Sequence, residues 1–453
     1  MLTFNFMAPP RKKVLIITYY WPPSGGVGVL RCLKMAKYFR QFGWEPIIFT
    51  AKGAHYPSLD YSNEADIPSD ITVLQQQIWE PYHLYKRFTR QKKDANVNNV
   101  FYVKDKKLGW AHQLSVWIRS NFFIPDARAL WIRPSVRFLL RYLKHNPVDA
   151  IISNGPPHTN TRIATILKQK TGIPWLADFQ DPWTQVDYFR LLKLTSWGKA
   201  KHERMEQEAL KMANKITIVS PTWKKDLETL GAKNVSVIHW GYDPEDFASI
   251  HSQIDQKFTL THLGIMGYDR NPKELFTALK KLCKELPDLK TDLEIKLVGQ
   301  VDYSVLEAIG ANGLEANTNC LGSVSRKEAL QIMCNSQVLL LLLNRQLNVK
   351  GRIPGKLFEY IAADRPILGM GPEDSDAGKI IANFDRGDIC AYTDVEKIKA
   401  VVRSYYLQYK NGLLANKEGV DISAFSNINL TRKLAGFLED MLPTSKAKHL
   451  TSK

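Results

Sequence analysis

The sequence predicts an α/β protein built from two parallel-sheet domains. At 453 residues the chain exceeds the size, about 250 to 300 residues, at which a single hydrophobic core stops growing. Short runs of apolar and β-branched residues recur along it, as in strands that are buried on both faces. Amphipathic helical patterns separate these runs, and this alternation is typical of parallel sheets.

The expected strands form two series. The first series comprises residues 14–18, 46–50, 71–75, 149–154, 175–179, 216–220 and 235–240. The second comprises residues 258–266, 293–299, 318–322, 338–343, 366–369 and 389–392. Helices are expected at 28–42, 159–170, 199–213, 272–286, 326–334, 395–409 and 429–441.

The polar segment 243–254 interrupts this alternation, and we expect the interdomain hinge there. The predicted domains are therefore residues 1–245 and 255–425, followed by a C-terminal helix and basic tail at 426–453. Five scattered cysteines without a C-x-x-C pair argue against a disulfide framework and favour a reducing cytoplasm. The apolar run 338–343 is far shorter than the ~20 residues of a membrane span.

The formal net charge of +17 predicts an anionic partner, such as nucleic acid, anionic lipid or a phosphorylated substrate. Residues 80–144 hold fourteen basic and four acidic side chains, with eleven aromatic residues interleaved between 79 and 131. Basic and aromatic residues together are typical of a membrane interface and of single-stranded nucleic-acid binding.

A glycine-containing turn at residues 351–355 precedes a helix expected to begin near Pro354. The N-terminus of such a helix favours a phosphate, and Glu359 in its first turns can accept both hydroxyls of a ribose. This layout suits a nucleotide sugar. Alternatively, Glu359 is an exposed glutamate that complements the helix dipole.

A second glycine-rich turn, residues 21–31, follows the first expected strand and opens a helix. Such a turn lets the backbone approach a diphosphate, although a plain strand-to-helix turn would look the same. It is not a dinucleotide fingerprint, because Arg31 stands at the position of the third glycine.

Three polar residues follow strands of the first series and should lie at the carboxyl edge of its sheet, where open α/β folds bind ligands. His158 could donate to a sugar hydroxyl, or pack beside Pro157 at a helix start. Asp178 and Asp181 could contact an acceptor hydroxyl. Asp181 could instead cap a helix that begins at Pro182.

Residues 351–368 resemble the donor-binding motif of GT-B glycosyltransferases, family 4 in particular. Residues 156–158 and 177–183 are similar to the Pro-Pro-His and Asp-Phe-Arg-Asp-Pro-Trp signatures of one branch, with Gln180 in place of arginine. The resemblance extends over residues 12–440. It implies two Rossmann-like domains that face a central cleft, the acceptor on the first and the donor on the second.

The resemblance also implies roles for single residues. Arg270 and Lys273 would hold the donor diphosphate and stabilise its departure, and are catalytic candidates together with His158 and Asp181. Asp178 would lie on the acceptor side. The further donor-binding candidates are Gly25, Gly26, Pro354, Gly355, Lys356 and Glu359. Glu359 matches the second of the two glutamates that the family commonly shows, whereas the first position is Gly351.

The expected activity is transfer of a sugar from a nucleotide diphosphate to an acceptor hydroxyl, with retention at the anomeric carbon implied by the family. The expected setting is cell-surface polysaccharide or glycolipid synthesis, with a glycan or lipid-linked acceptor. The expected location is the cytoplasm, with an anionic membrane surface as a further partner. No metal or other cofactor is expected, because no carboxylates or histidines show ligand spacing.

Two alternatives belong to other classes. A GT-B sugar-nucleotide epimerase would use Glu359 in the same way. A non-enzymatic nucleic-acid-binding protein would explain the charge, but recognised nucleic-acid motifs are absent from the sequence and no nucleic-acid partner is expected.

Overall fold

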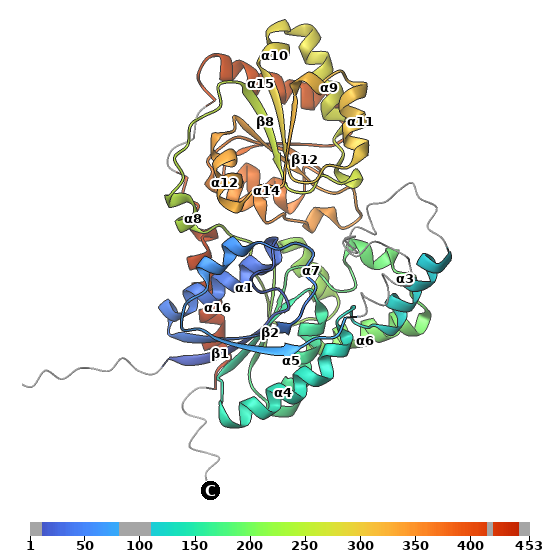
Figure 1. Cartoon of the computed structure of the whole chain (residues 1–453), viewed down its shortest axis with the longest axis vertical. Helices are drawn as coiled ribbons and strands as arrows, with labels where there is room; N and C mark the ends of the chain where they lie inside the picture. Colours follow the sequence, from blue (N-terminus) through green and yellow to red (C-terminus); the bar gives the residue numbers. More distant parts are fainter. Residues whose placement is uncertain (1–10, 81–109, 415–419, 444–453) are drawn as a thin grey trace, which may run out of the picture.

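The structure is a computed structural model that describes residues 11–80, 110–414 and 420–443. These residues form two α/β domains, which Figure 1 shows one above the other. The first domain holds a seven-stranded sheet and the second a six-stranded sheet, and every strand pair is parallel. The predicted fold class is confirmed.

The two sheets share one pattern of strand order. The first runs β3-β2-β1-β4-β5-β6-β7 and the second β10-β9-β8-β11-β12-β13. The order therefore reverses between β1 and β4 and again between β8 and β11, and ligands bind beside such switch points. The first-domain strands are β1 (Lys12–Ile17), β2 (Trp44–Lys52), β3 (Thr72–Gln77), β4 (Ala150–Gly155), β5 (Trp175–Phe179), β6 (Lys215–Ile218) and β7 (Val235–Val237). The second-domain strands are β8 (Phe258–Leu263), β9 (Leu293–Val298), β10 (Thr318–Gly322), β11 (Val338–Leu342), β12 (Ile367–Met370) and β13 (Gly387–Cys390).

Helices cover both faces of each sheet. In the first domain they are α1 (Val27–Tyr38), α3 (Trp110–Phe122), α4 (Ile132–His145), α5 (His158–Thr171), α6 (Ser196–Met212) and α7 (Pro221–Thr229). The hinge contains α8 (Pro244–Ala248). The rest are α9 (Lys273–Glu285), α10 (Pro287–Asp292), α11 (Tyr303–Ala311), α12 (Arg326–Asn335), α13 (Lys356–Ala362), α14 (Asp376–Asn383), α15 (Val395–Lys410) and α16 (Asn427–Met441).

Short 3-10 turns complete the connections. They are η1 (Phe39–Phe42), η2 (Tyr61–Asp66), η4 (Ala129–Trp131), η5 (Asp187–Leu191), η6 (Tyr268–Arg270), η7 (Glu315–Asn317), η8 (Val349–Gly351) and η9 (Ser423–Phe425). All thirteen predicted strands are present, as are the seven predicted helices of the two series and the helix expected near Pro354, which is α13. The helices α3, α4, α7, α8, α10, α11 and α14 were not predicted.

The C-terminal helix α16 returns to the first domain and packs beside α1 and β1 (Figure 1). Leu430, Leu434 and Leu438 are buried against the sheet face that carries Ile16. The chain therefore crosses between the domains twice. The two crossings are hydrogen-bonded to each other, because Tyr242 N–H donates to Phe425 O at 3.1 Å and Asn427 N–H donates to Tyr242 O at 2.8 Å.

The hinge helix α8 is anchored to the first domain by ion pairs. Lys34 of α1 is almost completely buried, and its Nζ lies 2.5 Å from Asp243 Oδ2 and 3.2 Å from Asp246 Oδ1. Lys34 also pairs with Asp66 of η2. Lys37, one turn further along α1, contacts both Asp66 and Asp243. These pairs fix the first half of the hinge to α1.

Substitution Lys34→Met should lower the free energy of unfolding by about 3 to 5 kcal/mol, because it leaves buried carboxylates without a partner. Equilibrium unfolding in urea measures this change. The matched control is Lys281→Met, whose pair with Glu396 lies at the surface and should hardly affect stability. Equally small effects of the two substitutions would contradict the anchoring role of Lys34.

Candidate functional site

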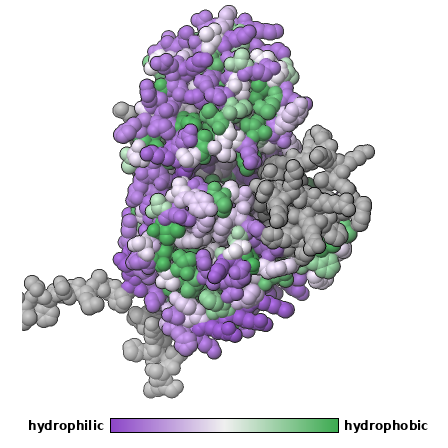
Figure 2. Space-filling model, in the orientation of Figure 1, coloured by the Kyte–Doolittle hydropathy of each residue, from purple (hydrophilic) through white to green (hydrophobic). Residues whose placement is uncertain are grey.

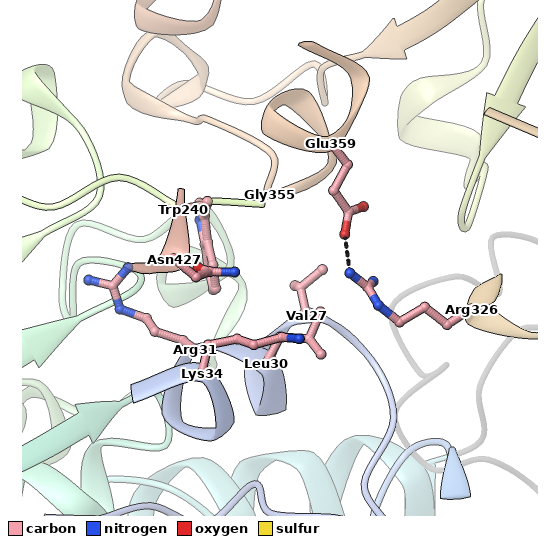
Figure 3. A pocket seen from close by; sticks show the side chains of 10 residues that line it. Val27, Leu30, Arg31, Lys34, Trp240, Arg326, Gly355, Glu359 and Asn427 are labelled. Atoms are coloured by element: carbon pink, nitrogen blue, oxygen red, sulfur yellow. Dashed lines mark ion pairs between the residues drawn. The ribbon is translucent and has the colours of Figure 1, made fainter. Parts of the chain in front are cut away.

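A cleft lies where the two domains and their linking segments meet. The boundary between the domains is visible in Figure 2 as a furrow. Figure 3 shows that the cleft is closed on one side by α1 and on the other by α12 and α13. Its lining residues are Val27, Leu30, Arg31, Lys34, Trp240, Gly241, Arg326, Gly355, Glu359 and Asn427.

Glu359 points from α13 into this cleft and pairs with Arg326 (Figure 3). Arg326 Nη2 lies 2.9 Å from Glu359 Oε1 and 2.6 Å from Asp246 Oδ2 of the hinge helix. Burial opposes the charge on Arg326, but Glu359 and Asp246 together raise the pKa of its guanidinium. Arg326 was not among the predicted site residues.

Arg326 completes a chain of ion pairs that spans both domains. Lys34 of the first domain holds Asp246, Asp246 holds Arg326, and Arg326 holds Glu359. The side chain of Glu359 is only 13% exposed. The alternative that Glu359 is an exposed glutamate that only complements the helix dipole is therefore wrong. Its orientation depends on the hinge.

Lys356 and Arg270 lie close to Glu359 in the second domain. Lys356 Nζ donates to Leu263 O at the end of β8. Burial above all, and secondly the positive charge of Arg270, lower the pKa of Lys356 to about 7, whereas Glu359 raises it. Arg270 follows β8 in η6 and is half-buried, while Lys273 is exposed at the start of α9. Arg270, Lys356 and Glu359 therefore form one electrostatic group.

Helix α13 begins at Lys356, two residues later than Pro354, with Gly355 at its N-cap. The N–H groups of Leu357 and Phe358 already donate to Pro354 O and Gly355 O. Fewer first-turn N–H groups are therefore left for a phosphate than the sequence suggested.

The glycine-rich turn at residues 21–31 opens α1 as predicted. Gly26 is the N-cap of this helix and has φ of 84°, a left-handed conformation that favours glycine. Gly25 N–H donates to Ser58 O at 2.9 Å, and a Cβ on Gly25 would lie 2.7 Å from Ser58 Oγ. Val27, the next residue after Gly26, lines the cleft.

His158 is the first residue of α5 and is buried. Its ring stacks on Trp183 with centroids 4.5 Å apart and an interplanar angle of 2°. Within the described part of the chain neither ring nitrogen has a hydrogen-bond partner. Burial, with a smaller contribution from His202, lowers the pKa of His158 to about 3. His202, which was not predicted, accepts a hydrogen bond from Trp183 Nε1 at 3.1 Å.

Asp178 lies at the carboxyl end of β5 as expected, but its carboxylate is buried and accepts four hydrogen bonds. Arg31 donates two of them, from Nε at 2.7 Å and from Nη2 at 2.6 Å. Asn154 and Thr217 donate the others at 2.8 and 2.7 Å. In this structure the carboxylate of Asp178 therefore joins neighbouring segments of the first domain. Its contact with an acceptor hydroxyl stays a prediction. The sequence did not predict Arg31 as the partner of Asp178.

Asp181 is half-buried in the loop after β5. Burial raises the pKa of its carboxyl, Arg352 lowers it and Asp187 raises it. The alternative that Asp181 caps a helix at Pro182 is wrong, because residues 180–186 form bends and the next helical turn is η5.

Gly351 stands where the family commonly has its first glutamate, and the structure shows its surroundings. A Cβ at this position would lie 2.4 Å from Cδ1 of Trp223 in the first domain. Without movement of the domains there is consequently no room for a side chain at residue 351.

In the part of the chain that the structure describes, one group of acidic side chains has the spacing of metal ligands, namely Asp66, Asp243 and Asp246. All three contact Lys34 Nζ. The ammonium group thus already supplies the positive charge at this place.

Residues 24–246 match the sequence model of Glycosyltransferase Family 4. A search of the curated proteins found no match.

Three solved structures are similar over nearly their whole length. Anabaena HepE in complex with UDP has a TM-score of 0.58 and 14% identity, over 95% of this chain and 100% of that one. WaaG, a glycosyltransferase involved in lipopolysaccharide biosynthesis, has a TM-score of 0.53 and 15% identity, over 97% and 100%. The trehalose-6-phosphate structure from E. coli, bound with UDP-2-fluoro glucose, has a TM-score of 0.58 and 11% identity, over 95% and 98%.

The family match and the two-domain fold together define the class. The chain is a glycosyltransferase of the GT-B type, and its residues 24–246 are similar to family 4. The expectation that it resembles this family is confirmed, and the match supports neither the epimerase nor the nucleic-acid alternative. None of the helices formed by the described residues has the length and apolar character needed to cross a membrane.

Proposed function

We propose that this glycosyltransferase uses a nucleotide diphosphate sugar and that its second domain binds the nucleotide. The observation that carries this proposal is the position of Glu359, which Arg326 holds at the cleft beside Lys356 and Arg270. A carboxylate there suits the hydroxyls of a ribose, and cations beside it suit a diphosphate. Two similar structures are described as complexes with UDP and with UDP-2-fluoro glucose, which supports this donor class.

The cationic groups have a catalytic task in this proposal. Negative charge develops on the diphosphate as the bond to the sugar breaks, and cations placed there stabilise the transition state more than the ground state. We assign this task to Arg270 and Lys356, with Lys273, Gly25, Gly26 and the Pro354–Gly355 turn as further donor contacts. An anion beside Lys356 would favour its charged form, because its pKa of about 7 is easily raised.

The acceptor enters from the first domain in this proposal. The ring of His158 is buried against Trp183, but neither of its nitrogens has a hydrogen-bond partner in the described part of the chain, and an imidazole can donate to or accept from a sugar hydroxyl. Asp181 lies in the loop after β5, two residues before Trp183, and we assign it a contact with the acceptor hydroxyl. The family implies retention without an enzymic nucleophile, so the departing diphosphate would take the acceptor proton. We propose a glycan or lipid-linked acceptor in polysaccharide or glycolipid synthesis, and no metal.

Substitution Arg270→Ala should lower kcat by about 100-fold, in the range found when one group that stabilises developing charge is removed. The measurement is release of nucleoside diphosphate from a panel of nucleotide sugars in the presence of glycan acceptors. Lys327→Ala removes an exposed charge beside Arg326 and is the matched control, with unchanged kcat expected. Isomerised donor without transfer would show instead that the protein is an epimerase.

We further propose that the first domain associates with anionic lipid through α3, the end of η5 and the start of α6. These segments lie side by side, since Asn121 Nδ2 of α3 donates to Lys193 O at 2.9 Å, and Thr195 N–H at the N-cap of α6 donates to Asn121 Oδ1 at 2.7 Å. They expose the apolar side chains Leu114, Trp117, Ile118, Phe122, Leu191 and Trp197. Lys201 lies over the Trp197 ring at 4.7 Å, and Lys193 and Lys199 are its basic neighbours. An apolar face with a basic rim fits a membrane surface. Of the basic stretch at 80–144, residues 81–109 lie outside the described residues.

The double substitution Trp197→Ala and Lys201→Ala should weaken co-sedimentation with vesicles that contain phosphatidylglycerol, and added salt should do the same. Vesicles of phosphatidylcholine alone are the control for charge. Equal binding of the unaltered protein to both kinds of vesicle, or to neither, would refute the lipid contact and leave the donor assignment untouched.

A further inference from the structure

The first turn of α7 contacts the second domain at two consecutive residues. Thr222 donates to the two carboxylate oxygens of Asp376, from its backbone N–H at 2.8 Å and from Oγ1 at 3.0 Å. Trp223, the next residue, lies against Gly351 of η8. Figure 1 shows α7 and α14 facing each other across the domain boundary, with the hinge helix α8 at the left edge. These four residues form a contact that we call the α7 latch.

Asp376 completes the N-terminal capping of a helix in the other domain. Pro221 at the start of α7 has no N–H group, and the N–H of Trp223 already donates to the N-cap Ser220. Thr222 N–H is therefore left for Asp376, the first residue of α14, and the helix dipole further stabilises a carboxylate at this position. Among the described residues, Asp376 accepts hydrogen bonds from Thr222 alone, although its side chain is only 3% exposed. The buried carboxylate thus depends on the first domain for its hydrogen bonds.

The glycine at residue 351 allows the close approach of the second contact. Trp223 is buried in the core of the first domain, and a Cβ at residue 351 would lie 2.4 Å from its Cδ1 and 2.5 Å from its Nε1. The indole cannot move aside, because the core around it is closely packed. A side chain at residue 351 would therefore separate η8 from α7, and with them the two domains.

The α7 latch adds to the link that the hinge provides. At the hinge Arg326 bridges Asp246 and Glu359. Away from the hinge the latch joins α7 to α14 and η8, and Asn344 of the second domain donates to Asp187 of the first at 2.7 Å. The cleft takes its lining residues from α1 of the first domain and from α12 and α13 of the second. Release of the latch would consequently widen the cleft while the hinge stays joined.

We propose that the α7 latch holds the two domains together and that its release controls the entry and departure of ligands at the cleft. Hydrogen bonds to a charged group are about twice as strong as those between neutral groups. Loss of the Asp376 carboxylate should therefore shift the domains strongly toward an open arrangement. The claim about nucleotide exchange rests on the proposed function, whereas the claim about domain closure does not.

Small-angle X-ray scattering of the full chain, with no nucleotide added, tests the latch itself. Asp376→Ala removes the attraction and Gly351→Ala adds a steric clash, so each should raise the radius of gyration above that of the unaltered protein. Asp302→Ala removes an equivalent helix cap within the second domain, and Gly436→Ala fills open space, so these controls should leave the radius of gyration unchanged. Scattering of Asp376→Ala and Gly351→Ala that matches the unaltered protein would overturn the latch.

The rate of nucleotide release tests the control of the cleft. Surface plasmon resonance on the immobilised protein measures the dissociation rate of UDP, or of GDP if it binds more tightly. Asp376→Ala should raise this rate by about ten- to a hundredfold, the factor that corresponds to a lost hydrogen bond to a charged group. Gly351→Ala should change the rate in the same direction, and the two control variants should release the nucleotide as slowly as the unaltered protein.

The two measurements separate this inference from the proposed function. An unchanged release rate in variants whose scattering shows open domains would overturn the control of the cleft. If neither UDP nor GDP binds, the claim about exchange fails together with the proposed donor class, while the scattering still decides whether the latch holds the domains. Circular dichroism spectra that match the unaltered protein ensure that the variants are folded.

Discussion

Arg326 links the hinge to the second domain, because it holds two carboxylates at once. Asp246 belongs to the hinge and Glu359 to the face of the second domain that lines the cleft. Asp246 is in turn held by Lys34, which is buried in the first domain. A planar guanidinium with its fixed fork of donors is suited to such a bridge, because little conformational freedom is lost for each bond that it forms. The carboxylate proposed for the ribose is therefore oriented by residues of both domains.

The two parallel sheets explain why the remaining groups gather at the same cleft. Each strand order reverses once, and the loops after β4 and β5 in one domain and after β8 and β11 in the other carry the polar residues. In such sheets the backbone at the carboxyl ends of the strands is free of further strand pairing and can turn toward a ligand. His158, Arg270 and Arg352 come from three different loops of this kind. Because each domain has its own sheet, the proposed donor and acceptor sites lie on different domains.

The strands could be predicted from the sequence, because strands such as residues 338–342 are buried on both faces and are therefore apolar throughout. The helix α4 was not predicted, although it is amphipathic, with Val136 and Leu139 buried and basic residues such as Arg137 and Arg141 on its other side. Glu359 could be predicted from its place after a glycine turn. Arg326 could not, since a basic residue that follows a capping serine is common at a helix start.

Contacts between residues far apart in the chain account for the other differences. Asp178 looked available to an acceptor, but Arg31, 147 residues earlier, occupies its carboxylate. The glycine at 351 looked like a missing functional group, whereas the structure explains it by the indole of Trp223. Neither contact leaves a signal in local sequence pattern, because each arises when distant segments pack together.

The most direct test of the account asks whether Glu359 recognises a ribose. Affinities for UDP and for 2′,3′-dideoxy-UDP are measured calorimetrically with the unaltered protein and with Glu359→Ala, or with the guanosine pair if GDP binds more tightly. The account predicts that the unaltered protein prefers the nucleotide with both hydroxyls and that Glu359→Ala binds the two nucleotides equally. A preference that survives the loss of Glu359 would contradict it.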